Sequence, residues 1–218
     1  MDDNNKLDNY ESEKPSKSGT PSKKTQDKLS FVKTLALFIA IAIVLRATVV
    51  EAYKIPSGSM LPTLQIGDHI LVTKFNYGFR LPFLKKSLFV FNTPERGDIV
   101  VFTRPNDPNT LSDESSINII KRVIGMPGDR VEIVNGQVFI NENLLIEPYA
   151  VWIEGGEGHY GPYTIPTNNY LLLGDNRDQS KDSRYWHDPF LPIDLIKGKA
   201  LIVYFNFSAF NRIGKLIK

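Results

Sequence analysis

The stretch IPSGSMLPTL, at residues 55–64, places two serines around a glycine shortly after an apolar run. Gly58 lets the backbone turn tightly and approach another chain closely. Ser57 and Ser59 are the nucleophile candidates of this stretch, because a serine hydroxyl becomes a good nucleophile once a neighbouring base removes its proton. The alternative interpretation is an ordinary loop with capping serines, and PSGS alone does not decide between the two.

A base for such a serine could come from the stretch NIIKRVIGMPGD. If this stretch is a strand, the alternation of side chains puts Lys121 on the same face as Ile119 and Val123. An apolar face disfavours the charged ammonium and lowers the pKa of the lysine, and a lysine that is neutral near pH 7 can act as a general base. Arg122 lies on the opposite face, so the alternative is that one of the two basic residues is simply exposed to solvent.

A third stretch, LLLGDNRDQSKDSRYWHD at residues 171–188, contains four acids and two arginines. A calcium loop is one interpretation, but the acids depart from the EF-hand ligand order, and Pro189 falls where the bidentate glutamate should be. Arg177 and Arg184 alternate with the acids, which indicates internal ion pairs and hydrogen bonds that fix a loop.

The composition of the 218-residue chain limits the chemistry to oxygen and amine groups. There are no cysteines, and the three histidines, His69, His159 and His187, do not fall in a metal-binding spacing such as HExxH. A Ser-His-Asp triad built on the adjacent pair His187 and Asp188 is disfavoured, because adjacent residues rarely face each other properly. Acids and bases are mixed along the chain, with a net charge of +2, so there is no broad basic field for a phosphate backbone. We expect no metal, no cofactor and no nucleic-acid partner.

The N-terminal part of the chain predicts a tail and a membrane anchor. Residues 1–30 are almost devoid of large apolar side chains and cannot bury enough surface to offset their ordering entropy, so we predict a disordered tail. Residues 31–50 are predicted to form a transmembrane anchor, since the long side chains of Lys33 and Arg46 can snorkel to either interface. The alternative is a cleavable signal peptide, against which the long polar preamble argues.

Lysines crowd the N-terminal side of the predicted anchor. The positive-inside rule therefore predicts a single pass with a cytoplasmic tail and with residues 51–218 as an extracytoplasmic domain. We expect the membrane to be the plasma membrane, although the rule itself does not identify it. Ser59 follows Val50 by nine residues, a reach of at most about 30 Å, so Ser59 is expected near the outer membrane face. The lysines are Lys23, Lys24, Lys28 and Lys33.

Residues 51–218 carry the signals of a mainly β domain. Asn135-Gly136 is the preferred pair for a type I′ turn, so VEIV-NG-QVFI predicts a hairpin. No run with helical periodicity follows the anchor, apart from FNRIGKLIK near the end of the chain. We predict an antiparallel, barrel-like sheet, and the strand order does not follow from the sequence. The predicted strands are DHILVTKF, GDIVVFT, NIIKRVIG, DRVEIV, QVFINENLL, NYLLLG and KALIVYF.

In combination, the motifs of this chain resemble those of type I signal peptidases, membrane-bound serine proteases with a Ser/Lys dyad. The matching motifs occur in the family's order and span nearly all of the chain after residue 30. The resemblance implies that the chain cleaves signal peptides from exported precursor proteins, after small residues, beside a lipid bilayer. The motifs are IPSGSMLPTL, GDHILVTKFNYG, RGDIVVF, IIKRVIGMPGD and GDNRDQSKDSRYW.

The resemblance also implies a role for each matching residue of the first two stretches. Ser59 corresponds to the nucleophile and Lys121 to the general base. Ser57 corresponds to the residue whose hydroxyl joins the backbone N–H of Ser59 in an oxyanion hole.

Three residues of the last motif correspond to supporting positions. Ser180 matches a residue that orients the lysine amine, and Asp182 and Arg184 match an ion pair that buttresses the site. The chain departs from the family at His187, where relatives usually have a glycine after the tryptophan. This departure concerns the local shape after the last motif more than the dyad.

Three other functions compete with this interpretation. Self-cleaving repressors use Ser and Lys on a related β fold, but they have DNA-binding domains and no anchor. A specialised processing peptidase with few substrates is not distinguished from a general one. A membrane-tethered β module that binds extracytoplasmic partners would keep its function in a Ser59→Ala variant, whereas a peptidase would lose it.

Overall fold

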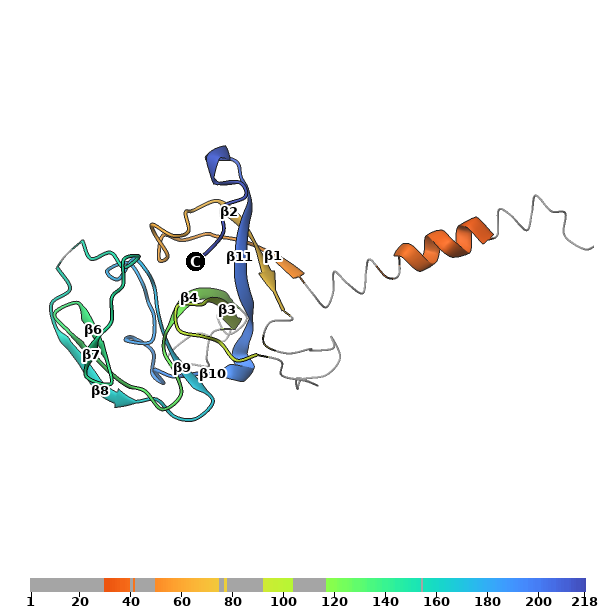
Figure 1. The fold of residues 1–218 in the computed structure, drawn as a ribbon. Coiled ribbons are helices and arrows are strands. Elements are labelled where there is room, and N and C mark those ends of the chain that lie inside the picture. Colours follow the sequence, from red (N-terminus) through yellow and green to blue (C-terminus); the bar gives the residue numbers. More distant parts are fainter. Residues whose placement is uncertain are drawn as a thin grey trace, which may run out of the picture. The chain divides into compact units, whose positions relative to one another are not determined.

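The chain divides into two units, Met1–Ala42 and Ile43–Lys218. In the first unit, residues 30–39 and 41 are helical (Figure 1). The side chains of these residues are exposed. Among the described residues, none of the helices has the length and the apolar character needed to cross a bilayer. The computed structural model describes residues 30–39, 41, 50–74, 77, 92–103, 117–153 and 155–218.

The predicted tail lies almost wholly outside this description, and the predicted anchor lies partly outside it. Of residues 1–30 only Ser30 is described, and of residues 31–50 residue 40 and the segment 42–49 are not described. The disordered tail and the membrane-spanning anchor therefore stay predictions.

The second unit is built from two antiparallel sheets (Figure 1). The larger sheet has the order β1 (Val50–Lys54), β2 (Asp68–Thr73), β11 (Ile196–Asn206), β3 (Ile99–Thr103), β4 (Asn118–Gly125), β9 (Asn169–Leu173) and β10 (Leu191–Pro192). The smaller sheet has the order β7 (Asn143–Leu144), β6 (Gln137–Ile140), β5 (Arg130–Val134) and β8 (His159–Thr164). Two short 3₁₀ helices, η3 (Ile193–Leu195) and η4 (Phe210–Arg212), flank β11.

The mainly β, antiparallel prediction is confirmed, but the barrel is not formed. In the part of the chain that is described, β1 pairs only with β2 and β10 pairs only with β9, so the larger sheet is open. β10 is two residues long and contains Pro192, which has no N–H to donate to a further strand. This edge therefore ends the sheet instead of closing it.

Most predicted strands are present, and the hairpin is confirmed. Val134 pairs with Gln137, and the two residues between them both have positive φ, 48° at Asn135 and 79° at Gly136, as a type I′ turn requires. The sequence patterns missed β1, β8 and β10. β8 reads HYGPYT, and its glycine and proline are turn residues that conceal the strand.

β4 lies between β3 and β9, and its second half is buried on both faces. Val123 belongs to a buried apolar cluster against which Ile119 also packs, as the predicted alternation requires. Lys121 and Arg122 are both buried, so the alternative in which one of them is exposed to solvent is wrong. Because both faces of the second half of β4 are buried, this strand holds a lysine and an arginine inside the molecule.

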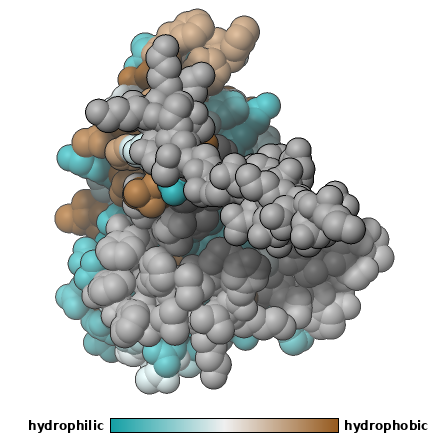
Figure 2. All heavy atoms as spheres, turned by 90° about the vertical axis from the view of Figure 1, so that its right-hand side faces the viewer, coloured by the Kyte–Doolittle hydropathy of each residue, from teal (hydrophilic) through white to brown (hydrophobic). Residues whose placement is uncertain are grey.

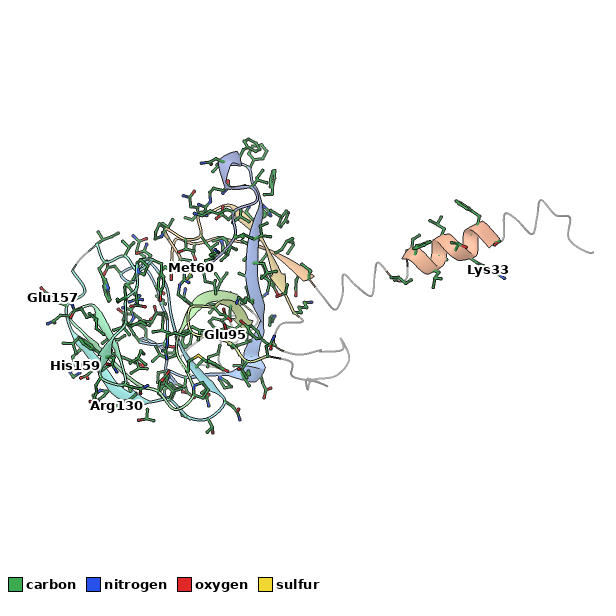
Figure 3. All side chains as sticks on the ribbon, viewed as in Figure 1. Lys33, Met60, Glu95, Arg130, Glu157 and His159 are labelled. Atoms are coloured by element: carbon green, nitrogen blue, oxygen red, sulfur yellow. The ribbon has the colours of Figure 1, made fainter. Side chains whose placement is uncertain are left out.

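The loop that carries Ser59 is held by apolar side chains that pack against the larger sheet. Met60, labelled in Figure 3, and Leu64 are fully buried in a cluster with Ile70 and Val101 of the larger sheet. The N–H of Leu64 donates to the carbonyl of Met60 at 2.9 Å, which closes the loop on itself. The apolar residues that follow the two serines therefore fix the position of the loop.

A buried ion pair fastens the same loop at its far end. The carboxylate of Asp68 accepts hydrogen bonds from Arg212, whose Nη2 also donates to the carbonyl of Thr63 at 3.0 Å. Burial by itself would raise the pKa of Asp68, but the hydrogen bonds from Arg212, Asn206 and the N–H of Gln65 hold this pKa below its ordinary value. The aspartate is therefore charged at neutral pH and ties the loop to the end of β11.

Candidate active site

Ser59 and Lys121 come together in the second unit although 62 residues separate them. The Nζ of Lys121 donates a hydrogen bond to the Oγ of Ser59, with 2.7 Å between the two atoms. Lys121 is 3% exposed and Ser59 is 8% exposed. This is the separation and the shielding from water that proton transfer between a hydroxyl and a base requires.

The surroundings of Lys121 lower its pKa to about 8. Burial is the largest cause, because it removes water from the charged ammonium. The negative charges of Asp182 and Asp175 act in the opposite direction, and the positive charge of Arg184 lowers the pKa further. About one Lys121 side chain in ten is then neutral at pH 7, compared with far fewer for an exposed lysine.

We call residues 55–64, which carry the candidate nucleophile Ser59, the nucleophile loop. Gly174 lies between this loop and Ser180. A methyl group on Gly174 would lie 2.5 Å from the carbonyl oxygen of Ser59 and would overlap the hydroxyl of Ser180. The Ser59 carbonyl and the Ser180 side chain can both approach this residue only because it has no Cβ. Sequence reasoning missed Gly174, since its glycine looked like an ordinary strand end.

Ser180 is buried, and its Oγ has no hydrogen-bond partner in the described part of the chain. The structure therefore places Ser180 beside the nucleophile loop, across Gly174, but shows no hydrogen bond from Ser180 to Lys121. Its predicted role in orienting the lysine amine stays a prediction.

Asp182 and Arg184 form the expected ion pair. The Nε of Arg184 lies 2.8 Å from one carboxylate oxygen of Asp182, and its Nη2 lies 2.9 Å from the other. Asp182 also accepts a hydrogen bond of 2.9 Å from the N–H of Gly174, and Arg184 donates one of 2.6 Å to the carbonyl of Arg177. The charges of Asp182 and Arg184 act on the pKa of Lys121, and their hydrogen bonds hold the backbone at Gly174 and Arg177.

Ser57 and Asn176 both lie next to Ser59, the candidate nucleophile. Ser57 is exposed, and its Oγ lies 3.5 Å from the Oγ of Ser59. Asn176 was missed from the sequence: its N–H donates to the carbonyl of Ser59 and its Nδ2 to the carbonyl of Gly58, each at 3.1 Å. These two bonds attach the nucleophile loop directly to residues 171–188, which we call the charged stretch because of its acids and arginines.

The charged stretch makes ion pairs that the sequence did not assign. Asp175 pairs with Arg122 of β4, through bonds of 2.8 Å to Nε and 2.7 Å to Nη2, and accepts a bond of 2.5 Å from Thr63. Arg177 was expected to pair within the stretch, but its partner is Glu147, 2.6 Å away. That expectation was wrong because the segment before β8 reaches the stretch from outside, which no local pattern reveals.

Within the described segments, no group of three or more His, Cys, Asp or Glu side chains could hold a metal ion. The acids at the site hold arginines instead. His187, the departure from the expected glycine, is exposed, whereas Ser59 and Lys121 are buried.

Comparison with known proteins gives a consistent family. Residues 28–205 match the family described as "Signal peptidase, peptidase S26". A signal peptidase I of Pseudomonas fluorescens is 37% identical over 233 residues, covering 87% of this chain and 79% of the relative. A probable signal peptidase I-2 of Synechocystis sp. is 39% identical over 188 residues, covering 86% of this chain and 77% of the relative. A crystal structure of a signal peptidase I from Enterococcus faecalis V583 is 28% identical and covers 50% of this chain and 97% of its own, with a TM-score of 0.39.

We predict that Gly174→Ala separates Ser59 from its supporting residues. The methyl group has no free space, so the nucleophile loop or Ser180 must move. A displacement of about 1 Å lowers kcat about 100-fold. The measurement is the cleavage rate of a precursor that bears a signal peptide, together with the thermal unfolding midpoint. Gly155→Ala is the control, because it has positive φ and open space and should cost only about 1 kcal/mol of stability. Equal cleavage by the parent and the Gly174→Ala protein would contradict this description of the site.

Proposed function

The chain belongs to the signal peptidase family, peptidase S26, and we propose that it removes N-terminal signal peptides from exported precursors with Ser59 as nucleophile and Lys121 as general base. The chain is a serine peptidase by its family. The observation that carries the proposed dyad is the hydrogen bond of 2.7 Å between the buried Nζ of Lys121 and the Oγ of Ser59. No other pair of described side chains joins a buried serine hydroxyl to a lysine amine.

The first half of the proposed reaction is acylation. Neutral Lys121 takes the proton of Ser59, and the Oγ attacks the carbonyl carbon of the scissile bond. The backbone N–H of Ser59 and the hydroxyl of Ser57 donate to the oxygen that becomes negative. The ammonium of Lys121 then gives its proton to the departing amine, which leaves the signal peptide as an ester on Ser59.

The second half is hydrolysis of this ester. Lys121, neutral again, takes a proton from water, and the hydroxide attacks the ester carbon. The proton returns to the Oγ of Ser59, and the signal peptide leaves as a carboxylic acid. The same amine serves both halves because burial keeps its pKa near the working pH.

The supporting residues position the backbone beside the dyad and adjust the pKa of Lys121. Asp182 holds the N–H of Gly174, and with Arg184 it adjusts the pKa of the base through their opposite charges. We assign Ser180 to the orientation of the lysine amine, because its hydroxyl is buried next to the Ser59 loop and has no hydrogen-bond partner among the described residues.

We propose that the chain has a tail at 1–30, a membrane anchor at 31–50 and a catalytic domain at 51–218, and that it acts at a bilayer. Two features support this proposal. The helical residues 30–39 expose apolar side chains, among them Phe31 and Phe38. In the second unit, Phe205, Phe207 and Phe210 gather at the end of β11 and in η4 with ring centroids 6.4–6.5 Å apart, and apolar spheres lie at this end of the molecule in Figure 2. We call these three residues the phenylalanine cluster, and we propose that it meets the outer leaflet of the plasma membrane.

The dyad is tested by substitution. Ser59→Ala and Lys121→Ala are each expected to lower the cleavage rate of a secretory precursor in detergent micelles about 1,000-fold or more, because the nucleophile or its base is lost. Ser208→Ala and Lys181→Ala change exposed residues of the same types and should leave the rate unchanged.

The outcomes of this experiment separate the competing functions. Undiminished cleavage by the Ser59→Ala protein would reject the proposed nucleophile. Absence of cleavage by the parent protein with several precursors would favour a peptidase with a narrow range of substrates.

The pH dependence of kcat/KM tests the role of Lys121 and its neighbours. The base works only when neutral, so kcat/KM should rise with pH with a midpoint of about 8. Asp182→Asn removes a charge that raises the pKa and should move the midpoint to lower pH, whereas Arg184→Gln removes a charge that lowers it and should move the midpoint to higher pH. Asp188→Asn is the exposed control. Shifts in the same direction for both variants would reject this electrostatic assignment.

Contact between the phenylalanine cluster and lipid is tested with a fluorescent reporter. Phe207 is 79% exposed, so Phe207→Trp should fold normally, and brominated acyl chains should quench its fluorescence in proteoliposomes. Ile146→Trp is the control, since Ile146 is 84% exposed and lies outside the cluster. The signal of each variant is corrected for the native Trp152 and Trp186. Equal quenching of the two reporters would remove the support that the cluster gives to the proposed orientation.

A further inference from the structure

Glu147 lies outside the five family motifs quoted above, yet its side chain is only 6% exposed. Its Oε1 accepts a hydrogen bond of 2.6 Å from the Nη2 of Arg177 and one of 3.1 Å from the hydroxyl of Tyr149. A carboxylate in such a position is usually present because a buried positive charge needs it.

Arg177 is that buried charge. Its side chain is fully buried, and Glu147 is the one acid with which it forms an ion pair in the described part of the chain. Its Nε donates to the carbonyl of Gly174 at 3.0 Å, while its Nη1 has no partner among the described atoms. The positive charge of Arg177 is therefore neutralised by Glu147, and its guanidinium donates one hydrogen bond to the carbonyl of Gly174.

Side chains thus hold both peptide groups of Gly174. The Nε of Arg177 binds its carbonyl oxygen, and Asp182 binds its N–H at 2.9 Å. Gly174 is the residue that has no room for a methyl group between Ser59 and Ser180. A shift of Gly174 therefore changes the contact between the nucleophile loop and its support.

The segment at residues 147–152 is fastened to the charged stretch along its length. Val151 donates its N–H to the carbonyl of Asp175 at 2.8 Å and accepts a bond of 2.9 Å from the N–H of Arg177. The ring of Tyr149 covers the guanidinium of Arg122, with 3.7 Å between Cζ and the ring centroid. The position of Glu147 is therefore fixed by the same segment that lies against the site.

We infer that Glu147 is a positioning residue of the peptidase, which holds Gly174 through Arg177 and so keeps the Ser59 loop and Ser180 close to Gly174. This inference rests on the proposed function. Among the described residues Glu147 binds Arg177 and Tyr149 and makes no hydrogen bond to Ser59 or Lys121, so we expect its effect to fall on kcat and not on substrate binding. It also predicts that charge at this position matters more than side-chain size.

The test compares Glu147→Gln with Glu142→Gln in the full chain, in detergent micelles, with a secretory precursor as substrate. Glu147→Gln leaves Arg177 without an anion, and we expect kcat to fall about 10-fold or more while KM stays within about two-fold. Glu142 pairs with Arg130 on the surface, so Glu142→Gln should change neither constant. Glu147→Asp keeps the charge and should recover part of kcat. A Glu147→Gln protein that is folded and has a kcat within two-fold of the parent would overturn the inference.

A second variant separates positioning from stability. In Glu147→Leu/Arg177→Met the buried charges are gone together, so the thermal unfolding midpoint should return toward that of the parent. The bond to the carbonyl of Gly174 is also gone, so kcat should stay at least about 10-fold low. Recovery of kcat together with the midpoint would show that the pair is structural only, and would overturn the inference even if Glu147→Gln does not fold.

The Ser59→Ala protein is assayed beside these variants. Cleavage by Ser59→Ala would reject the proposed function whatever the Glu147 variants do. Loss of cleavage in Ser59→Ala with full activity in the Glu147 variants would reject only the positioning role.

Discussion

Burial of the Lys121 amine is the constraint on which the rest of the site depends. An exposed lysine is almost always protonated at neutral pH and cannot act as a base, and an isolated ammonium in an apolar interior is strongly unfavourable. β4 resolves this by placing Lys121 where burial lowers its pKa to about 8 and where its amine donates to a single hydroxyl, that of Ser59. The strand must therefore be central, and both of its faces must be covered.

The two loops that meet at the lysine are held by different means, according to what each must present. The Ser59 loop presents a side chain, and its buried neighbours Met60 and Leu64 anchor it in the apolar cluster on one face of the sheet. The charged stretch presents backbone and small side chains. Its backbone is fixed by hydrogen bonds that buried arginines donate to its carbonyls and by one that the N–H of Gly174 donates to the carboxylate of Asp182. Asn176 joins the two loops through bonds to the carbonyls of Ser59 and Gly58. Their relative position is thus defined by directed bonds and not by packing alone.

Much of this arrangement could be predicted from local patterns, because strand alternation and turn chemistry act over a few residues. The side of β4 on which Lys121 lies and the Asn135-Gly136 hairpin followed from such patterns. The open edge of the larger sheet, the partner of Arg177 and the tight space at Gly174 did not follow. Each of these depends on which distant segments meet, and the periodicity of a single stretch carries no such information.

The distribution of acids explains why one basic residue of the site can titrate and its neighbours cannot. Arginine stays protonated in proteins, so each buried guanidinium needs a carboxylate in contact. Arg122, Arg177 and Arg184 each have one, at Asp175, Glu147 and Asp182. Lysine can lose its proton instead, so Lys121 can be buried without a carboxylate of its own. In the described residues its amine binds only the serine hydroxyl, while Asp182 and Asp175 act on it from a distance. A carboxylate in direct contact would raise the pKa of Lys121. Because the nearby acids pair with arginines instead, Lys121 can act as the base that we propose.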